Sequence, residues 1–254
     1  MTIDDGEEQI YRRPLSGAEI TTLPSARVPA RDVISGRFVD LEPQDAARHT
    51  AELFEAGHGS EEALRIWDYL AYGPWPDEAT YTATLRKQSA SFDPIFFAVR
   101  SHATGRAAGQ TSMMDIHAEN GVIEIGNIWF GPDLQRTRGA TEALYLMIRH
   151  AMDDLGYRRM QWRCNSLNAK SRQAARRLGF RFEGIFYNHL IFKGMNRDTA
   201  WYSILDDEWP EIRDLMEAWL GDANFDAAGV AKTSLFDAMQ ARGESERRVG
   251  GGYS

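Results

Sequence analysis

The feature that most constrains the fold is the order of patterns between Val122 and Phe182. An alternating segment, Val122 to Phe130, is followed by a turn rich in Gln, Arg and Gly and then by an amphipathic stretch. A second alternating segment, Tyr157 to Cys164, leads into a short helical pattern. This order predicts a strand–helix–strand unit. Its loop-to-helix junction would direct backbone N–H groups and the positive end of a helix dipole at one point, where we expect an anion to bind.

The boundaries of this unit carry recognisable signals. Thr137 is a candidate N-cap for the first helix, and Gly156 stands where a glycine commonly follows a helix. Asn168 is a candidate cap for the second helix, which Gly179 ends. The apolar stripe of the first helix comprises Ala140, Leu144, Met147, Ile148, Ala151 and Leu155. In the second strand, Met160, Trp162 and Cys164 share one face, and Arg159, Gln161 and Arg163 share the other.

The charge of this unit differs from that of the chain. From Arg136 to Arg181 there are 11 Lys and Arg residues against 3 Asp and Glu residues, a net charge of +8. The whole chain carries −8, so the remainder carries −16. A basic zone within an acidic protein indicates a polyanionic ligand of modest size, such as a nucleotide cofactor; the alternative is a solvated helix face rich in Arg.

Length and composition limit the class of protein. With 254 residues and 43% hydrophobic content, we expect an N-terminal arm over residues 1–30, one domain over 31–220, and a partly disordered tail over 221–254. No apolar run is long enough for a membrane span, and the acidic start does not resemble a secretory signal. The single Cys164 fits a reducing cytoplasm. An acidic pI near 5.3 argues against general nucleic-acid binding.

Local patterns predict further elements on both sides of the central unit. The loop Tyr69 to Pro76 is rich in aromatic residues, Gly and Pro, and either forms the wall of a ligand site or covers the core. We predict strands at Arg37–Leu41, Ile95–Arg100, Ala107–Ile116, Ile185–Phe192 and Thr199–Leu205, a loop at Lys193–Asp198, and helices over about 42–56, 61–70, 78–91 and 209–220.

Several motifs of other enzyme classes are absent from the sequence. It contains no G-x-S-x-G, C-x-x-C, H-E-x-x-H or Walker loop, and no G-x-G-x-x-G follows the strand. The six histidines are scattered singly, so we expect no metal site.

The segment Gln135–Ala143 resembles the acetyl-CoA signature of the GNAT acetyltransferases. More narrowly, it resembles the branch that acetylates the N-termini of ribosomal proteins, the RimL and RimJ type. The resemblance extends over roughly residues 35–210. Supporting segments are Arg37–Leu41, Glu124–Gly126, Asn168 with Ser171 before Leu178–Phe180, and Arg197–Thr199 with Trp201.

This resemblance implies an α+β fold, a mixed αβ sandwich whose central mixed sheet contains two parallel strands that splay apart. Acetyl-CoA would lie in the cleft between them, with its pantetheine arm along the strand from Glu124 to Trp129. Its pyrophosphate would sit on N–H groups from Arg136 to Thr141, in agreement with the anion site expected above. The implied coenzyme A contacts are Ile128, Trp129, Gln135, Arg136, Thr137, Arg138, Gly139, Ala140, Thr141, Asn168 and Ser171.

The sequence departs from the family pattern at two places. The pattern is Gln/Arg-x-x-Gly-x-Gly/Ala, and a start at Gln135 puts Arg138 in the first glycine position. If the pattern starts at Arg136 instead, Gly139 occupies the first glycine position, but Thr141 occupies the last position, where the family has Gly or Ala. A large side chain at position 138 could alter the loop, although a guanidinium could also contact the pyrophosphate. The tyrosine that many members carry as proton donor falls on Ala175.

Acetyl transfer to an amine requires a neutral amine, a polarised carbonyl and a proton for the departing thiolate. Glu124, eleven residues before Gln135, matches the spacing of the glutamate base in histone-type members. A backbone N–H near Gly126 or Asn127 would hold the carbonyl oxygen, and Ser171 matches the serine proposed as acid in the ribosomal branch. Each has a structural alternative: Glu124 could fix the loops, and Asn168 and Ser171 could simply begin a helix.

The acceptor is less constrained than the donor. The net charge of −16 on the chain outside Arg136–Arg181 would attract a cationic amine. This amine would be either a protein N-terminus or a small molecule such as a polyamine or an aminoglycoside. Its expected contacts are Tyr72, Trp75, Glu124, Tyr187 and His189. The partners expected are acetyl-CoA and an amine acceptor, with a homodimer left open. The alternatives are a non-catalytic acyl-CoA-binding or regulatory module on the same fold, or an αβ interaction protein without a cofactor.

Overall fold

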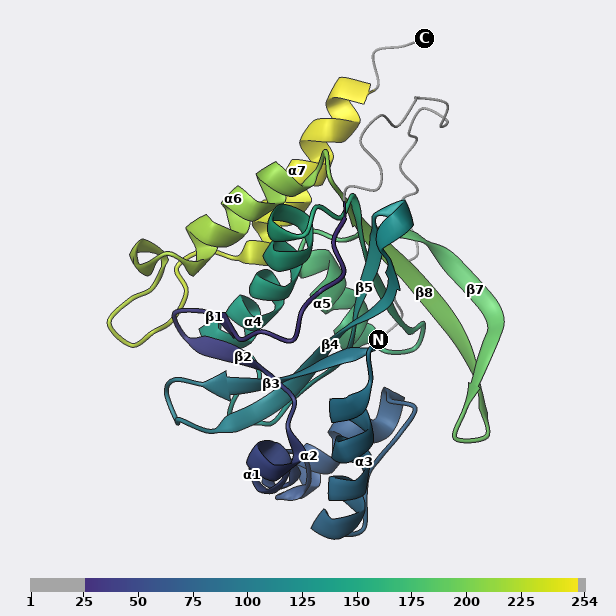
Figure 1. The fold of residues 1–254 in the computed structure, drawn as a ribbon. Coiled ribbons are helices and arrows are strands. Elements are labelled where there is room, and N and C mark those ends of the chain that lie inside the picture. Colours follow the sequence, from purple (N-terminus) through teal and green to yellow (C-terminus); the bar gives the residue numbers. More distant parts are fainter. Residues whose placement is uncertain (1–25, 251–254) are drawn as a thin grey trace.

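The fold is built on one mixed sheet, drawn in Figure 1. The structure is a computed structural model that describes residues 26–250, with side chains to residue 243. Neighbouring strands are antiparallel except for β5 and β6, and β8 lies between β6 and β7. This arrangement confirms the predicted α+β fold. In sheet order the strands are β1 (Ile34–Ser35), β2 (Val39–Pro43), β3 (Ile95–Ser101), β4 (Ala107–His117), β5 (Val122–Phe130), β6 (Arg159–Asn165), β8 (Met195–Leu205) and β7 (Arg181–Phe192).

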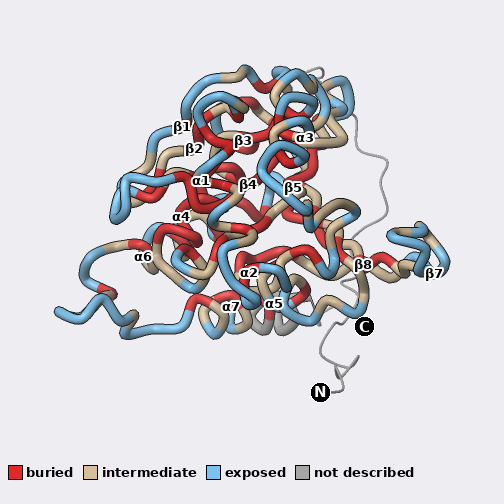
Figure 2. Tube along the Cα trace, turned by 90° about the horizontal axis from the view of Figure 1, so that it is seen from below, coloured by how far each residue is buried: buried red, intermediate tan, exposed pale blue. Residues whose placement is uncertain are grey.

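Helices cover both faces of the sheet, and each face has its own core. Along β3, Phe97 and Val99 pack into the larger core beneath α4, whereas Ala98 joins a smaller cluster with Trp67 and Tyr81 beneath α1 to α3. Figure 2 shows these buried segments running through the centre of the molecule. The helices are α1 (Ala46–His58), α2 (Glu61–Leu64), α3 (Glu78–Ala90), α4 (Arg138–Arg149), α5 (Ala169–Arg177), α6 (Trp209–Leu220) and α7 (Leu235–Gly250). Single turns occur at Arg65–Tyr69, Ala118–Asn120, His150–Asp154 and Asp222–Asn224.

The β5–α4–β6 unit forms as its boundary signals predict. The side chain of Thr137 caps α4 by accepting the N–H of Ala140 at 3.1 Å. After α4 the chain continues through a π-helical turn, His150–Asp154, and Gly156 then takes a left-handed conformation with φ 79°. Asn168 caps α5 by accepting the N–H of Ser171 at 3.1 Å. The local signals in this part of the sequence therefore agree with the fold.

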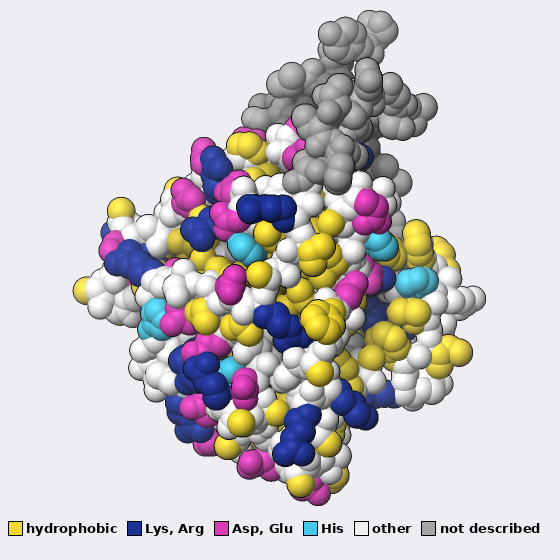
Figure 3. Space-filling model, viewed as in Figure 1, with side chains coloured by type: hydrophobic (Ala, Val, Ile, Leu, Met, Phe, Trp, Pro, Cys, Tyr) yellow, Lys and Arg dark blue, Asp and Glu magenta, His cyan; other side chains and the backbone are white. Residues whose placement is uncertain are grey.

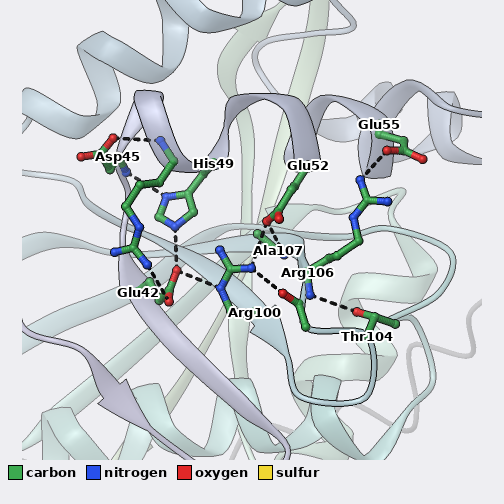
Figure 4. A network of polar contacts seen from close by, with 11 residues as sticks. Glu42, Asp45, His49, Glu52, Glu55, Arg100, Thr104, Arg106 and Ala107 are labelled. Atoms are coloured by element: carbon green, nitrogen blue, oxygen red, sulfur yellow. Dashed lines mark hydrogen bonds and ion pairs between the residues drawn. The ribbon is translucent and has the colours of Figure 1, made fainter.

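A buried ionic network fastens α1 to the sheet (Figure 4). His49 contacts Glu42 at 2.7 Å through Nε2, while its Nδ1 accepts the N–H of Asp45 at 3.0 Å. The proton of the imidazole therefore lies on Nε2 and is donated to the carboxylate. Arg100 on β3 bridges Glu42 and Glu52, at 3.2 and 3.1 Å. The network holds the first helix against β2 and β3 without contributing to the cavity described below.

The structure corrects the predicted loop Lys193–Asp198. Strand β8 already begins at Met195, and only Lys193 and Gly194 form the turn, with φ of 50° and 76°. Two central residues with positive φ match a type I′ hairpin, whose twist suits the flanking strands. The polar residues Asn196 to Asp198 are therefore part of a strand. Figure 2 shows this hairpin extending from the body of the molecule, with much of it exposed.

The C-terminal region contains a helix that the sequence analysis did not predict. Helix α7 runs from Leu235 to Gly250, and its buried residues Leu235 and Met239 join the larger core. The predicted N-terminal arm lies mostly in residues 1–25, and the last four tail residues are 251–254; both segments lie outside the described residues. No helix within residues 26–250 is long and apolar enough to cross a membrane.

Candidate active site

The central cleft arises because β5 and β6 pair over only three residues. Val122, Ile123 and Glu124 pair with the start of β6, after which the two strands separate. A bulge bends β5 at this point: its register against β4 shifts beyond Gly126, and Asn127 has φ 52°. The predicted splay is therefore present. A cavity of about 350 Å³ opens between the strands, lined among others by Glu124, Ile128, Arg163, Asn168, Ser171 and Arg197.

Glu124 is a buried carboxyl group at the point where the strands part. It is 3% exposed and pairs with Arg163, whose guanidinium also contacts Asp115. Burial raises the pKa of Glu124 to about 8, although the charge of Arg163 opposes the rise. A carboxyl group in this condition is protonated at neutral pH and becomes a base slightly above it.

Side chains from β4 and from the segment before α3 hold the bulge. Ser112 donates to the carbonyl of Gly126 at 3.0 Å, and Gln110 donates to the carbonyl of Asn127 at 3.2 Å. Tyr72 donates to the Asn127 side chain at 3.0 Å. Within a trans peptide, the C=O of one residue and the N–H of the next point in opposite directions. The N–H groups of Asn127 and Ile128 therefore point away from β4, towards the cleft.

Ser171 lies on the opposite wall, in the first turn of α5. Its Oγ accepts the indole N–H of Trp162 at 3.1 Å, and its own N–H donates to Asn168. Among the described residues no acceptor is recorded for the hydroxyl proton of Ser171. The side chain is thus oriented by Trp162 while its proton remains available to a bound molecule.

The N-terminus of α4 presents free amide groups. Within the described part of the chain, no hydrogen-bond acceptor is recorded for the N–H groups of Arg136, Arg138 and Gly139. Arg136 has a left-handed φ of 61°, and such turns can form a concavity of N–H groups that binds anions. A Cβ built on Gly139 would lie 3.0 Å from Val39, so this glycine permits close packing against β2.

The side chain of Arg138 is directed away from this junction. Its Nε donates to the carbonyl of Leu220 at 3.0 Å, and its Nη2 contacts Asp222 at 2.9 Å. The guanidinium also lies over the rings of Phe38 and Phe225, 4.2 and 4.1 Å from their centres. Arg138 therefore joins the start of α4 to the segment after α6, and these contacts account for its place in a glycine position of the pattern.

Of the other predicted site residues, some line the cavity and others lie elsewhere. Ile128 and Asn168 line the cavity, whereas the segment Gln135–Thr141 lies at the far end of the β5–α4 connection and is not part of its lining. Trp129 is buried in the smaller core, against which Tyr72 and Trp75 also pack. His189 contacts Thr199 at 3.0 Å and, like Trp129, Tyr72 and Trp75, does not line the cavity.

Tyr187 is 75% exposed on the β7–β8 hairpin and is also absent from the lining. In Figure 3, hydrophobic side chains gather over this hairpin. Exposed hydrophobic residues of the hairpin are Phe186, Tyr187, Ile191 and Met195.

Several residues of the cavity lining were not among the predicted site residues, among them Trp162, Arg163 and Arg197. The alternation of the second strand placed Arg163 on its polar face, and the parallel register brings this face beside Glu124. That signal was present in the sequence. Arg197 was missed because it fell in a predicted loop. Among the described residues no group of three His, Cys, Asp or Glu side chains could hold a metal ion.

Comparison with known proteins identifies the family. Residues 38–181 match the model of the "Acetyltransferase (GNAT) domain", which covers more than half of the chain. The chain belongs to the GNAT acetyltransferase family. A GCN5-related N-acetyltransferase from Brucella melitensis is 45% identical, with a TM-score of 0.83, over 85% of this chain and 97% of that one. A Bacillus subtilis (strain 168) protein named "Putative ribosomal N-acetyltransferase YdaF" is 30% identical over 66% of this chain and 90% of its own length.

Acetyl-CoA is the acyl donor of GNAT acetyltransferases. The structure of the microcin C7 self-immunity acetyltransferase MccE contains acetyl-CoA and AMP; at 20% identity and a TM-score of 0.57, over 67% of this chain and 93% of that one, it supports the fold alone. The present residues fit this donor, because N–H groups without a recorded acceptor stand at the start of α4. The carbonyl contacts of the β5 bulge direct two more N–H groups into the cleft.

Proposed function

We propose that this acetyltransferase transfers the acetyl group of acetyl-CoA to a primary amine, by direct attack in a ternary complex. The acceptor would be a protein N-terminus, as in the RimL-type branch, or a small-molecule amine. The observation that carries the proposal is Glu124, a buried carboxyl group with a pKa of about 8, at the point where β5 and β6 separate.

Glu124 would remove the proton of the attacking amine. An alkyl amine is mostly protonated at neutral pH, so a base is required, and catalysis is most efficient when the pKa of the base lies near the working pH. Burial brings Glu124 into that range, whereas a solvated glutamate would be a much weaker base. Arg163 keeps part of the ionised form accessible by stabilising its charge.

The N–H groups of Asn127 and Ile128 would receive the carbonyl oxygen of the donor. Their direction is fixed before any ligand binds, because Ser112 and Gln110 hold the two carbonyls on the opposite side of the strand. Donors arranged in advance stabilise developing negative charge effectively, since they do not have to reorient during the reaction.

Ser171 would donate its proton to the leaving thiolate. The indole N–H of Trp162 occupies one lone pair of the Ser171 hydroxyl and fixes its orientation. The position of Ser171 in the first turn of α5 also places it near the positive end of the helix dipole, which favours a developing anion. The free N–H groups at the start of α4 would bind the diphosphate.

The decisive experiment measures release of free thiol from acetyl-CoA in the presence of a broad panel of amines, alongside the thermal stability of the protein with and without acetyl-CoA. We expect stabilisation by acetyl-CoA and thiol release with at least one amine, together with an acetylated product. Glu124→Gln should abolish most of this turnover, and the exposed Glu62→Gln should not. Stabilisation without thiol release on any amine would instead favour a non-catalytic acyl-CoA-binding module.

A further inference from the structure

The cavity contains a cation with no ionic partner in the described part of the chain. Arg197 of β8 lines the cavity and is partly buried. Its guanidinium lies 4.4 Å from the ring centre of Phe192, but no hydrogen bond or ion pair to any described residue is recorded for it. The Nε atom is fully buried and unpaired. A buried cation without a partner is costly, so such groups commonly mark a site for an anion.

The second guanidinium of the cavity is already occupied. Arg163 is paired with Asp115 and also contacts Glu124, so part of its charge is already compensated within the protein. Arg197 interacts electrostatically with both Glu124 and Arg163, which places it in the same part of the cavity. A new anion in the cavity would therefore pair with Arg197 rather than with Arg163.

The local charge of the cavity is positive, although the chain as a whole is acidic. At neutral pH Glu124 is mostly protonated, which leaves two guanidinium groups on the wall and one partly compensating carboxylate behind them at Asp115. Charges within a few ångströms act on a bound molecule far more strongly than charges on the outer surface, which salt and water screen. The charge of the acceptor should therefore be complementary to the positive charge of the cavity rather than to the negative net charge of the chain.

We propose that Arg197 binds a carboxylate of the acceptor, and that the substrate is therefore an amine that carries a carboxylate near its amino group. This inference rests on the proposed function and narrows its acceptor class. Two sources share this chemistry: a free α-amino acid, through its own carboxylate, and a peptide N-terminus with an acidic first residue. Polyamines and aminoglycosides are disfavoured, because their additional positive charges would meet Arg197.

Arg197 is not needed for the diphosphate of acetyl-CoA. The N–H groups at the start of α4 serve that role in the proposed function, and they lie outside the cavity lining that contains Arg197. A contribution of Arg197 to acceptor binding and one to donor binding can therefore be separated by measuring the KM of each substrate.

The test compares matched acceptors that differ only in the anionic group. One pair is alanine and alaninamide; the other is Asp-Ala-amide and Asn-Ala-amide. In the wild-type protein we expect kcat/KM to favour the anionic member of at least one pair by tenfold or more, and the pair that shows this preference identifies the source of the carboxylate. Arg197→Gln should lower this preference about 30-fold, the usual order of effect when one partner of a buried charge pair is removed.

Two further variants keep the result interpretable. Arg197→Lys retains the charge and should restore part of the preference, and its melting temperature shows whether the fold is intact. Arg86→Gln removes the same charge from an exposed position on α3 and should leave the preference unchanged.

Equal rates with both members of each pair in the wild type would overturn the inference but not the proposed function. An Arg197→Gln effect confined to the KM of acetyl-CoA would also overturn it. Absence of acetylation of any amine would remove the proposed function and this inference with it.

Discussion

Replacement of Glu124 by glutamine tests whether burial controls the protonation state of the cavity. Glutamine has nearly the same shape but remains neutral at every pH. In the folded protein the pKa of Glu124 is about 8, compared with 4.5 for an ordinary glutamate. Each unit of difference between the two pKa values corresponds to about 1.36 kcal/mol. Full ionisation of Glu124 therefore lowers the free energy of unfolding by about 5 kcal/mol relative to the protonated form. This is a large part of the 5–15 kcal/mol that typically stabilises a domain.

The direction of the pH effect follows from the raised pKa. A group whose pKa is higher in the folded state contributes its full stability below the unfolded pKa, and the contribution is lost as pH rises towards the folded value. The wild-type protein should therefore lose stability between about pH 4.5 and pH 8 relative to Glu124→Gln. At pH 5 the two proteins should be nearly equal in this respect, and at pH 9 the variant should be the more stable by several kcal/mol.

The assay is urea unfolding of wild type and Glu124→Gln at pH 5, 7 and 9. Glu62→Gln, at an exposed position on α2, is the control and should follow the wild type at each pH. The same Glu124→Gln protein should lose the rise in kcat/KM near pH 8, because the base is absent. A stability difference between Glu124→Gln and wild type that stays within about 1 kcal/mol from pH 5 to pH 9 would refute the argument that burial raises the pKa.

Four further variants test other parts of the account. Arg163→Met removes a charge that favours ionised Glu124, so the rise in kcat/KM should move to higher pH; an unmoved profile would contradict the role of Arg163. Ser171→Ala should lower kcat at least tenfold with a smaller change in the KM of acetyl-CoA, and an unaltered kcat would exclude Ser171 as the acid. Arg138→Met should lower the melting temperature, through loss of its contacts to Leu220 and Asp222, without raising the KM of acetyl-CoA; a raised KM would place Arg138 in the donor site. Burial alone would raise the pKa of Glu42, but its hydrogen bond to His49 and the charges of Arg100 and Arg48 outweigh burial and lower the pKa. The wild-type protein should therefore lose its stability advantage over Glu42→Gln as pH falls below about 4.5. A stability difference that stays constant down to about pH 3 would contradict this.

The central unit could be predicted from sequence because its signals are local. Thr137 and Asn168 cap the helices that they precede, and Gly156 takes the left-handed conformation that favours glycine. Each of these features depends on residues within one or two helical turns. The splayed parallel pair followed from the family resemblance, and the register of β5 and β6 confirms it.

Other parts depended on contacts between distant segments. The position of β8 between β6 and β7 is decided by pairing across the sheet, which local patterns do not report. Tyr72 belongs to an aromatic loop that fitted either a site wall or a core cover. The structure shows both roles within the loop: Tyr69 and Ala71 line the cavity, whereas Tyr72 packs against the smaller core with its hydroxyl on Asn127 and supports the bulge. Whether a residue of this loop faces the cavity or the smaller core depends on tertiary packing, which local sequence patterns do not report.

Arg197 illustrates a further reason why site prediction was incomplete. A polar run after a glycine resembles a loop, yet a two-residue turn places Arg197 in a strand beside the cavity. Likewise, the sequence showed that Arg138 departs from the family pattern but could not show that Leu220 and Asp222, more than eighty residues later, would hold its side chain.

A crystal structure with acetyl-CoA bound would test the central claim most directly. The account predicts that the donor lies between β5 and β6 with its carbonyl oxygen on the N–H of Asn127 or Ile128, while Arg138 keeps its contact with Asp222. Binding of acetyl-CoA outside this cleft, or displacement of its diphosphate from the start of α4 by the side chain of Arg138, would contradict the account.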